Sequence, residues 1–375
     1  MFVYVMLGSK CNFQCKYCMQ VPLIQEQYCP QEKNIDKIKP ILADANNHVF
    51  YMWGGEPLLY WDEFRMCVEY IREHNPKAEI ITISNGSLLT RDKVDFMNKY
   101  KVSLSVSGDG RPTAYTRGRD MFQDPEFLKL FLSIEAPKGI SVTLTALNQD
   151  IINDVWAYYE EILPPGTDYH MEVSFMSDYG VEDSLKTFDY KRLYKTISTI
   201  ADGFVDSVRA GNYNSKEYLF FRKPIARLKS VMGIGIGSAY DPRVLDYPRC
   251  MPTYGVINVD IEGNIMFCHN SDKRLSHVDN PEWLKESQDK FEPYNVYTKT
   301  AKCRNCPYYL YCGASCPLLH GEAREMACKL TKIYTLCFYR ALEGVGDIMA
   351  EHGGELPDLI APAKTFLGDK DRVTE

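Results

Sequence analysis

The chain lacks a long apolar run, a cluster of basic residues and an export signal. No apolar run approaches the length of about 18 residues that a helix needs to cross a bilayer, so we expect no membrane span. No run of five or more basic residues occurs and the formal charge is −7, so we expect no nucleic-acid partner. Residues 1–7 are apolar but have neither a basic leader nor a small-residue cleavage site, so they are not a signal peptide. These absences predict a cytoplasmic protein.

Cysteine, in contrast, is abundant. The 375 residues include 13 cysteines, and in a chain without an export signal such a number favours metal ligation over disulfides. Hydrophobic residues make up 45% of the chain and charged residues 25%, which is typical of a globular protein. The length is sufficient for two domains, or for one barrel with an extension.

Three of the cysteines form a tight group near the N-terminus. Cys11, Cys15 and Cys18 follow a Cys-x3-Cys-x2-Cys pattern. A [4Fe–4S] cube with full protein ligation needs four cysteines, so three leave one iron open to a small molecule. Structural zinc sites more often use paired cysteines with a matching second pair, which this triplet lacks.

The first half of the chain alternates short β-rich runs with helical patterns. The expected strands are 2–7, 48–53, 79–84, 102–107, 141–146 and 170–176, and the expected helices include 61–74, 91–99, 125–134 and 152–162. This alternation predicts an α/β fold with a largely parallel sheet, either open or an incomplete barrel. The cysteine triplet directly follows the first strand, at the edge where such folds collect function.

The cysteine pattern divides the chain further. We expect a barrel domain over 1–210, a bridging region over 211–246, a cysteine-rich module over 247–345 and a tail over 346–375. Residues 233–237 read Gly-Ile-Gly-Ile-Gly, which we interpret as a linker because a dinucleotide-binding loop needs GxGxxG after an early strand. In the C-terminal module, 256–261 and 264–267 predict a hairpin around Glu262-Gly263 that would bring Cys250 and Cys268 near each other.

The cysteine triplet, with Tyr17 before its last member, resembles the signature of the radical S-adenosylmethionine (SAM) enzymes. The resemblance implies a partial (β/α)6 barrel, a [4Fe–4S] cluster and SAM as cofactors. In that family the open iron chelates SAM, and an electron from the cube gives a 5′-deoxyadenosyl radical that abstracts hydrogen from substrate.

Further segments at successive strand ends resemble the family's SAM-binding motifs, although Ser107 stands where the family usually has Asp. Tyr17 would lie against adenine. The implied SAM-binding residues are Tyr17, Gly54, Gly55, Glu56, Ser84, Asn85, Ser105, Ser107 and Arg117.

The C-terminal cysteines resemble the SPASM extension of radical SAM enzymes, a module that carries up to two auxiliary [4Fe–4S] clusters. The resemblance assigns Cys250, Cys268 and Cys316 to the first auxiliary cluster, whose fourth position is open or filled by Cys337 or a non-cysteine ligand. It assigns Cys303, Cys306 and Cys312 to the second, with Cys328 as the favoured fourth ligand and Cys337 in reserve. Taken alone, the cysteines at 303–316 would equally suit a zinc module.

The resemblance implies an enzyme that oxidatively modifies a ribosomally made peptide, with a side-chain cross-link as the expected product. The alternatives are a sulfatase-type maturase, an enzyme acting on a small molecule, or a non-catalytic zinc-stabilised binding protein. Sulfatase maturases carry an acidic base where this chain has His269, which could serve as a base instead. An external electron donor of the flavodoxin or ferredoxin type is implied. Only ten residues precede the first cysteine, so either a separate protein presents the precursor, or the core region is recognised, or the substrate has no leader. The sequence leaves open the modified residue and the oligomeric state.

Overall fold

The computed structural model describes residues 1–20, 34–178, 180–231 and 255–351, in two compact units. The first unit comprises residues 1–142, 159–169 and 250–294, and the second comprises 143–158, 170–249 and 295–375. Residues 233–237, the predicted linker, and Cys250 lie outside the described residues. The predicted domain boundaries remain predictions.

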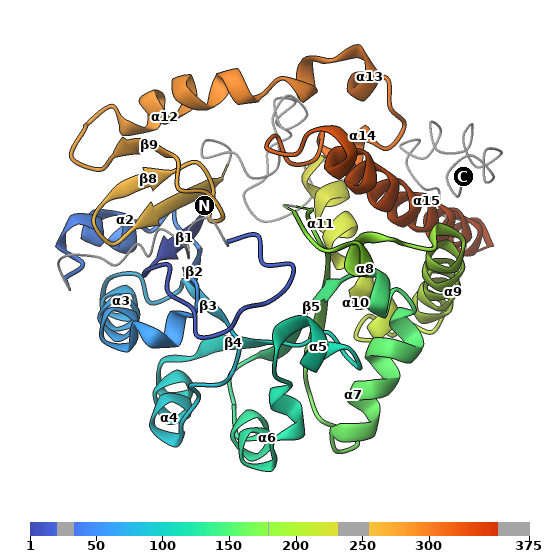
Figure 1. The fold of residues 1–375 in the computed structure, drawn as a ribbon, viewed down its shortest axis with the longest axis horizontal. Coiled ribbons are helices and arrows are strands. Elements are labelled where there is room, and N and C mark those ends of the chain that lie inside the picture. The colour runs from blue at the N-terminus through green and yellow to red at the C-terminus, as the bar shows by residue number, and fades with distance from the viewer. Residues whose placement is uncertain (21–33, 179, 232–254, 352–375) are drawn as a thin grey trace. The chain divides into compact units, whose positions relative to one another are not determined.

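The first unit is built on a mostly parallel sheet (Figure 1). Its strands occur in the spatial order β5-β4-β3-β2-β1-β7-β8-β9. Parallel pairing joins β1 to β2, β2 to β3, β3 to β4, β4 to β5 and also β1 to β7, whereas β7–β8 and β8–β9 are antiparallel. The strands are β1 (Phe2–Met6), β2 (Val49–Trp53), β3 (Glu79–Ser84), β4 (Val102–Ser107), β5 (Lys138–Leu144), β7 (Val256–Asp260), β8 (Asn264–Met266) and β9 (Arg274–His277).

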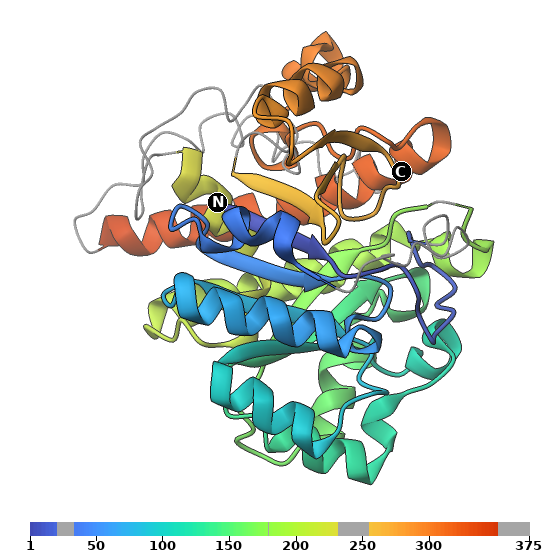
Figure 2. The same ribbon diagram turned by 90° about the vertical axis from the view of Figure 1, so that its left-hand side faces the viewer.

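Helices cover the outer side of this sheet. Figure 1 shows α2, α3 and α4 following one another along strands β1–β4, and Figure 2 shows α3 running alongside β1 and β2. The side chains of Val3, Val5, Phe50 and Met52 are fully buried, and each such burial contributes about 1.5–3 kcal/mol. The helices of this unit are α2 (Lys39–Ala43), α3 (Trp61–His74), α4 (Arg91–Tyr100), α5 (Thr113–Arg117), α6 (Pro125–Leu132) and α12 (Trp283–Phe291), with 3-10 turns at Asp36–Ile38, Pro57–Leu59, Met121–Gln123 and Glu292–Tyr294.

The second unit is mainly helical. Its strand is β6 (His170–Phe175), and its two longest helices, α9 and α15, pack against each other (Figure 1). Its helices are α8 (Asp183–Lys186), α9 (Tyr190–Arg209), α10 (Lys216–Phe220), α11 (Arg222–Val231), α13 (Ala301–Arg304), α14 (Tyr309–Cys312) and α15 (Gly321–Glu351), with 3-10 turns at Ala146–Asn148 and Tyr297–Lys299. A π-helix (Ile151–Trp156) leads into α7 (Ala157–Ile162).

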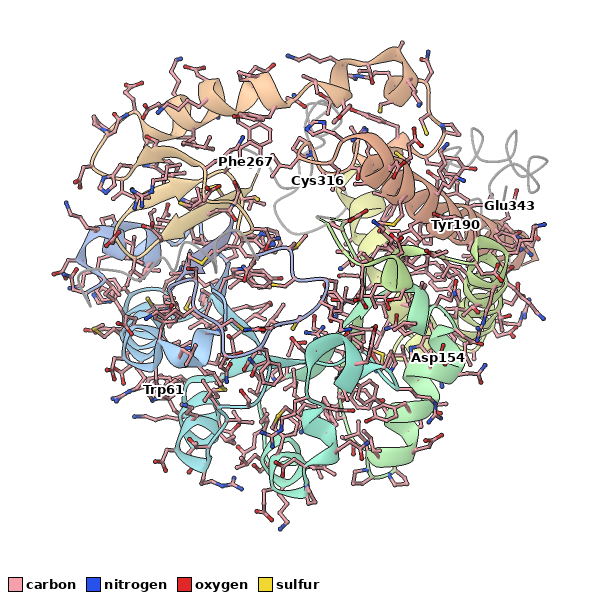
Figure 3. All side chains as sticks on the ribbon, in the orientation of Figure 1. Trp61, Asp154, Tyr190, Phe267, Cys316 and Glu343 are labelled. Atoms are coloured by element: carbon pink, nitrogen blue, oxygen red, sulfur yellow. The ribbon has the colours of Figure 1, made fainter. Side chains whose placement is uncertain are left out.

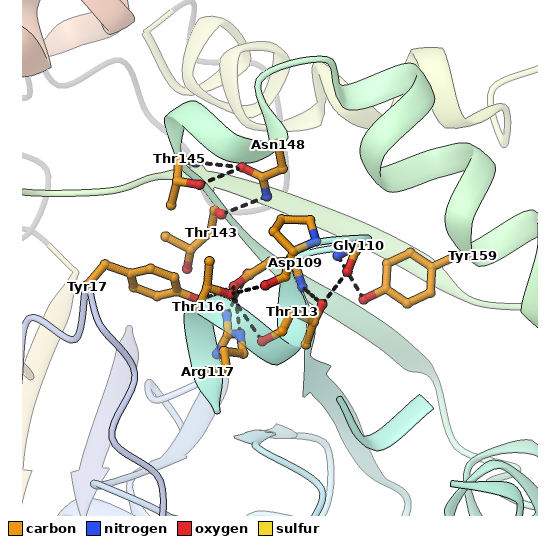
Figure 4. A network of polar contacts seen from close by, with 11 residues as sticks. Tyr17, Asp109, Gly110, Thr113, Thr116, Arg117, Thr143, Thr145, Asn148 and Tyr159 are labelled. Carbon is orange, nitrogen blue, oxygen red and sulfur yellow. Dashed lines mark hydrogen bonds and ion pairs between the residues drawn. The ribbon is translucent and has the colours of Figure 1, made fainter. Parts of the chain in front are cut away.

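The expected α/β architecture with a parallel sheet is confirmed, and most predicted strands are within a residue or two of the observed ones. The fifth strand is the exception, because it begins at Lys138 rather than 141. It ends at Leu144 because Thr145 caps the following turn, where its side chain and that of Asn148 form a capping box (Figure 4). Among the described residues, no helix is both long and apolar enough to span a membrane.

The hairpin predicted around Glu262-Gly263 is present. Gly263 has a φ of 91°, a conformation that glycine adopts without strain, and the buried carboxylate of Asp260 accepts hydrogen bonds from the backbone and side chain of Asn264. Phe267, labelled in Figure 3, stacks on Phe291 of helix α12 with ring centroids 4.7 Å apart. The hairpin joins the sheet of the first unit through the parallel pairing of β7 with β1.

Candidate active site and cluster ligands

The three N-terminal cysteines lie on the loop that leaves the carboxyl end of β1. Cys11, Cys15 and Cys18 are half-buried. Burial raises the pKa of Cys15 to about 11, and the nearby Cys18 and Cys11 raise it as well, so the three thiols lie within electrostatic range of one another. In the described part of the chain, no three His, Cys, Asp or Glu side chains converge closely enough to hold one metal ion. A [4Fe–4S] cube differs from a single metal ion because each thiolate binds a different iron, so its three cysteines need not converge on one point.

Gly54 and Gly55 follow β2 and are pressed against this cysteine loop. A Cβ atom at Gly54 would lie 2.4 Å from the carbonyl oxygen of Gly8, and one at Gly55 would lie 2.3 Å from that of Ser9. The Gly55 amide donates to Gly8 O at 3.1 Å, and the Glu56 amide donates to Lys10 O at 2.9 Å. The two glycines are therefore required by the close approach of the loop backbone, a role that the sequence analysis did not foresee.

Glu56 joins the end of β2 to the end of β3. Its buried carboxylate accepts from Ser84 Oγ at 2.7 Å, from the Asn85 amide at 2.8 Å and from the Leu58 amide at 3.0 Å. Burial raises the pKa of Glu56, whereas the hydrogen bonds from Asn85, Ser84 and Leu58 oppose that rise. Three predicted SAM-binding residues, Glu56, Ser84 and Asn85, are thus in mutual contact.

Asn85 in turn reaches the cysteine loop. Its Nδ2 donates to Asn12 Oδ1 at 2.9 Å and lies 4.0 Å from Cys11 Sγ. Asn12 also donates to Ser87 Oγ at 2.8 Å. The end of β3 therefore orients the loop beside its first cysteine.

A buried ion pair follows β4 and includes a residue that the sequence analysis missed. Asp109 is fully buried, and Arg117 binds it through Nε at 3.0 Å and Nη2 at 2.9 Å. The hydroxyl of Tyr17 also donates to Asp109, and Thr116 Oγ1 does so at 2.6 Å (Figure 4). The Arg117 guanidinium lies 5.3 Å from the centre of the Tyr17 ring. Two predicted residues, Tyr17 and Arg117, thus share one carboxylate.

A signal for Asp109 was present in the sequence. Ser107 was identified as occupying the family's Asp position, yet a carboxylate follows two residues later, in Asp109-Gly110. Ser107 is half-exposed and Ser105 is buried on β4, and neither is part of the ion-pair network. Lys16 links the cysteine loop to helix α5, because its amide donates to Thr116 O at 2.9 Å.

His269 follows Cys268, just beyond β8, and is enclosed by aromatic rings. It stacks on Tyr4 with ring centroids 4.5 Å apart and meets Trp53 edge-on at 4.8 Å. Burial lowers the pKa of His269 to about 4. Gln20 Nε2 donates to its backbone carbonyl at 3.1 Å.

In the second unit, four of the predicted ligand cysteines gather near the start of α15. Burial raises the pKa of Cys306, and Cys303 and Cys328 both contribute to the rise. Burial also raises the pKa of Tyr339, with contributions from Cys306 and Cys312. Cys303, Cys306, Cys312 and Cys328 are all half-buried, as is Cys316, which is labelled in Figure 3.

Cys337, the reserve ligand, has a different environment. It is fully buried, its Sγ lies 3.9 Å from the carbonyl oxygen of Tyr194 on α9, and burial raises its pKa to about 12. Cys328 and Cys337 are nine residues apart on one helix, which places them on opposite faces and about 13 Å apart along the axis.

The loop between Cys312 and Cys316 is strained. Gly313, Ala314 and Ser315 have φ values of 56°, 66° and 61°, and two of the three are not glycine. A residue other than glycine costs roughly 1–3 kcal/mol in this region, so the cost falls on Ala314 and Ser315, and such strain concentrates at functional sites.

Residues 5–119 match the family model described as the Radical SAM superfamily. This segment is a radical SAM domain. It includes the cysteine loop, the two glycines, Glu56 and the Asp109–Arg117 pair. The cofactors of such a domain are SAM and a [4Fe–4S] cluster.

Two curated relatives are similar in sequence. Radical SAM cyclopropyl synthase TigE of Paramaledivibacter caminithermalis is 22% identical, over 91% of this chain and 74% of its own. GTP 3′,8-cyclase of Helicobacter pylori is 29% identical over 29% of this chain and 34% of its own.

Solved structures are similar over most of the chain. Native anSMEcpe with bound AdoMet has a TM-score of 0.68 at 18% identity, covering 93% of this chain and 100% of its own. Streptococcus suis SuiB bound to precursor peptide SuiA has a TM-score of 0.58 at 16% identity, covering 84% of this chain and 71% of its own. At these identities the likeness establishes the fold, a radical SAM barrel with a C-terminal extension.

Proposed function

We propose that this chain is a radical SAM enzyme that oxidatively modifies a ribosomally made peptide by side-chain cross-linking, through a thioether, carbon–carbon or carbon–oxygen bond. One observation carries the proposal: the cysteine loop is fastened at the ends of successive parallel strands. Gly55 and Glu56 hold it after β2, Asn85 after β3 and Asp109 after β4. A rigid cradle of this kind is what a radical reaction needs to fix its cofactor.

The residues present fit the cofactors. Cys11, Cys15 and Cys18 would hold three irons of the cube, and the open iron would be left for SAM. When bound, the cube and SAM supply the 5′-deoxyadenosyl radical. The residues expected to bind and orient SAM are those of the strand-end motifs, namely Tyr17, Gly54, Gly55, Glu56, Ser84, Asn85, Ser105, Ser107 and Arg117.

The C-terminal cysteines would hold auxiliary [4Fe–4S] clusters. Cys303, Cys306, Cys312 and Cys328 fit the second, because their thiols influence one another or a shared neighbour. Cys250, Cys268 and Cys316 remain the proposed ligands of the first. In the SPASM interpretation these cysteines would hold clusters that supply an acceptor for the surplus electron or a binding site for a substrate heteroatom.

Two similar proteins support a peptide substrate. AnSMEcpe has been solved with bound AdoMet and the Cp18Cys peptide, and SuiB with precursor peptide SuiA. TigE is named a cyclopropyl synthase, so carbon–carbon bond formation is a reaction of a similar protein. A flavodoxin or ferredoxin would deliver the electron. His269 is the candidate base for proton removal.

The test uses the full chain, purified and reconstituted without oxygen. We expect a brown protein with about eight to twelve irons that releases 5′-deoxyadenosine from SAM when dithionite supplies electrons. Co-expression with the short reading frames beside its gene should give a peptide that has lost two hydrogen atoms at a cross-link mapped by tandem mass spectrometry. A colourless protein that binds zinc would support the non-catalytic alternative. SAM cleavage with every neighbouring peptide unmodified would instead favour a small-molecule substrate.

A further inference from the structure

One face of helix α15 carries two cations beside a predicted cluster ligand. Arg324, Cys328 and Lys332 are spaced four residues apart, so they share a face of the helix (Gly321–Glu351). That face is turned toward Cys303 and Cys306, because Arg324 contacts the first and Lys332 acts electrostatically on the second.

Arg324 is held in one orientation by three contacts. Its Nη2 donates to Cys303 Sγ at 3.4 Å and to Ala314 O at 3.1 Å, and its guanidinium lies 3.2 Å from the centre of the Tyr297 ring. Ala314 belongs to the strained loop between Cys312 and Cys316. One side chain therefore connects a predicted ligand thiol to the loop that carries two others.

One nitrogen of the same guanidinium donates no hydrogen bond within the described part of the chain. This nitrogen, Nη1, is buried and has no hydrogen-bond partner among the described residues. Leaving a buried charged donor unsatisfied costs more than a typical hydrogen bond contributes, so native proteins rarely do it. Together with the donor aimed at Cys303 Sγ, this orphaned group suits an acceptor that the polypeptide itself does not supply.

We propose that Arg324 is a positioning residue for the second auxiliary cluster, whose reduction potential it raises through its hydrogen bond to the Cys303 sulfur. The inference rests on the proposed function, because it assumes that Cys303, Cys306, Cys312 and Cys328 hold this cluster. Lys332 adds the field of a second positive charge without a hydrogen bond to sulfur.

The physical basis is electrostatic. One electron from the external donor adds one negative charge to the cluster and its thiolates, and no proton or bond changes partner. A fixed cation that donates to a ligand sulfur stabilises the reduced state more than the oxidised state. Hydrogen bonds to sulfur and net charge are among the factors that set the potentials of such clusters.

The experiment compares Arg324→Met, Arg324→Lys and Lys332→Met with Arg340→Met. Arg340 lies on the same helix but bonds Tyr194 on α9, so its variant is a matched control. All four are made in a background with Cys11, Cys15 and Cys18 replaced by alanine, which removes the signal of the N-terminal, SAM-site cluster. The readouts are iron content and the midpoint potential from an anaerobic titration followed by electron paramagnetic resonance.

We expect Arg324→Met to keep its iron and to be about tenfold harder to reduce, a shift of about 59 mV to more negative potential for one electron. Arg324→Lys and Lys332→Met should shift less in the same direction, and Arg340→Met should match the parent. If Arg324→Met loses its iron, the Arg324→Lys variant decides, and an unchanged potential there would overturn the inference. An unchanged potential in iron-loaded Arg324→Met would overturn it directly.

Failure of the underlying assignment gives a different result. Cys303→Ala and Cys328→Ala should each lower the iron content of the same background. If neither does, the ligand set in the proposed function is wrong, and the inference fails with it whatever the potentials of the arginine variants.

Discussion

Replacing Asp109 with Asn should destabilise the first unit severely, because it leaves the buried charge of Arg117 without its counter-charge. Asp109 is fully buried, and Arg117 has a relative exposure of 8%. Burial alone would lower the pKa of Arg117, but Asp109 reverses that effect and the pKa is raised. Removing one partner of a buried ion pair costs about 3–5 kcal/mol. For a unit of this size, that loss corresponds to an unfolding midpoint lower by about 6–20 °C.

The matched control is Glu161→Gln, which makes the same carboxylate-to-amide change at an exposed ion pair. Glu161 Oε1 lies 2.5 Å from Arg111 Nη2, and both side chains are about half exposed. Such surface pairs contribute about 0–1 kcal/mol, so this variant should unfold near the parent. Unfolding on heating would be followed by tryptophan fluorescence, on protein prepared without iron so that cluster loss does not confuse the comparison.

A third variant separates charge from packing. Asp109→Leu combined with Arg117→Met removes both charges and should recover much of the lost stability, because apolar replacement of a buried pair is often near neutral. The reasoning is refuted if Asp109→Asn costs no more than Glu161→Gln. It is also refuted if the double variant is less stable than Asp109→Asn.

Three further outcomes follow from the structure. Gly55→Ala would place a Cβ atom 2.3 Å from a loop carbonyl oxygen, so it should lose iron at the N-terminal site, whereas Gly203→Ala in α9 meets only a flexible side chain and should keep it; iron analysis checks both. Cys328→Ala should lose about four irons, whereas Cys337→Ala should lose none and cost roughly 1 kcal/mol of stability, as measured by iron content and denaturation. Burial alone would raise the pKa of Glu172, but Lys223 and Arg222 lower it. Its stabilising contribution should therefore be complete above about pH 4.5 and be lost as the pH falls through the lowered value. Glu172→Gln should flatten that acid limb, and equal slopes in both proteins would contradict the assignment.

The sequence was sufficient for features with local causes. Strand β3 was predicted with its observed bounds, Glu79–Ser84, and so was helix α3, Trp61–His74, because apolar periodicity determines both. The pairing of β7 with β1 was not predicted, since residues some 250 positions apart in the chain carry no pairing signal in their own side chains.

The site was predictable in its residue types but not in its connections. The resemblance implied SAM contacts for Gly54 and Gly55, and it gave no indication that they also make room for the cysteine loop. Asp109 was missed because the motif implied an Asp at the position of Ser107, and the carboxylate lies two residues later in the chain. Only three-dimensional packing shows that Tyr17, which lies far from Asp109 in the chain, donates its hydroxyl to it.

The described cysteines fall into two chemical classes, and the division argues for the proposed ligand set. Cys67 and Cys337 are fully buried, and the Cys337 thiol lies against the carbonyl oxygen of Tyr194, so neither sulfur is accessible to a metal. Cys11, Cys303 and Cys328 are only half-buried. An amide approaches the first and a guanidinium donates to the second. Donors of this kind stabilise charged sulfur, and a chain that used its cysteines for packing alone would have no reason to place them there.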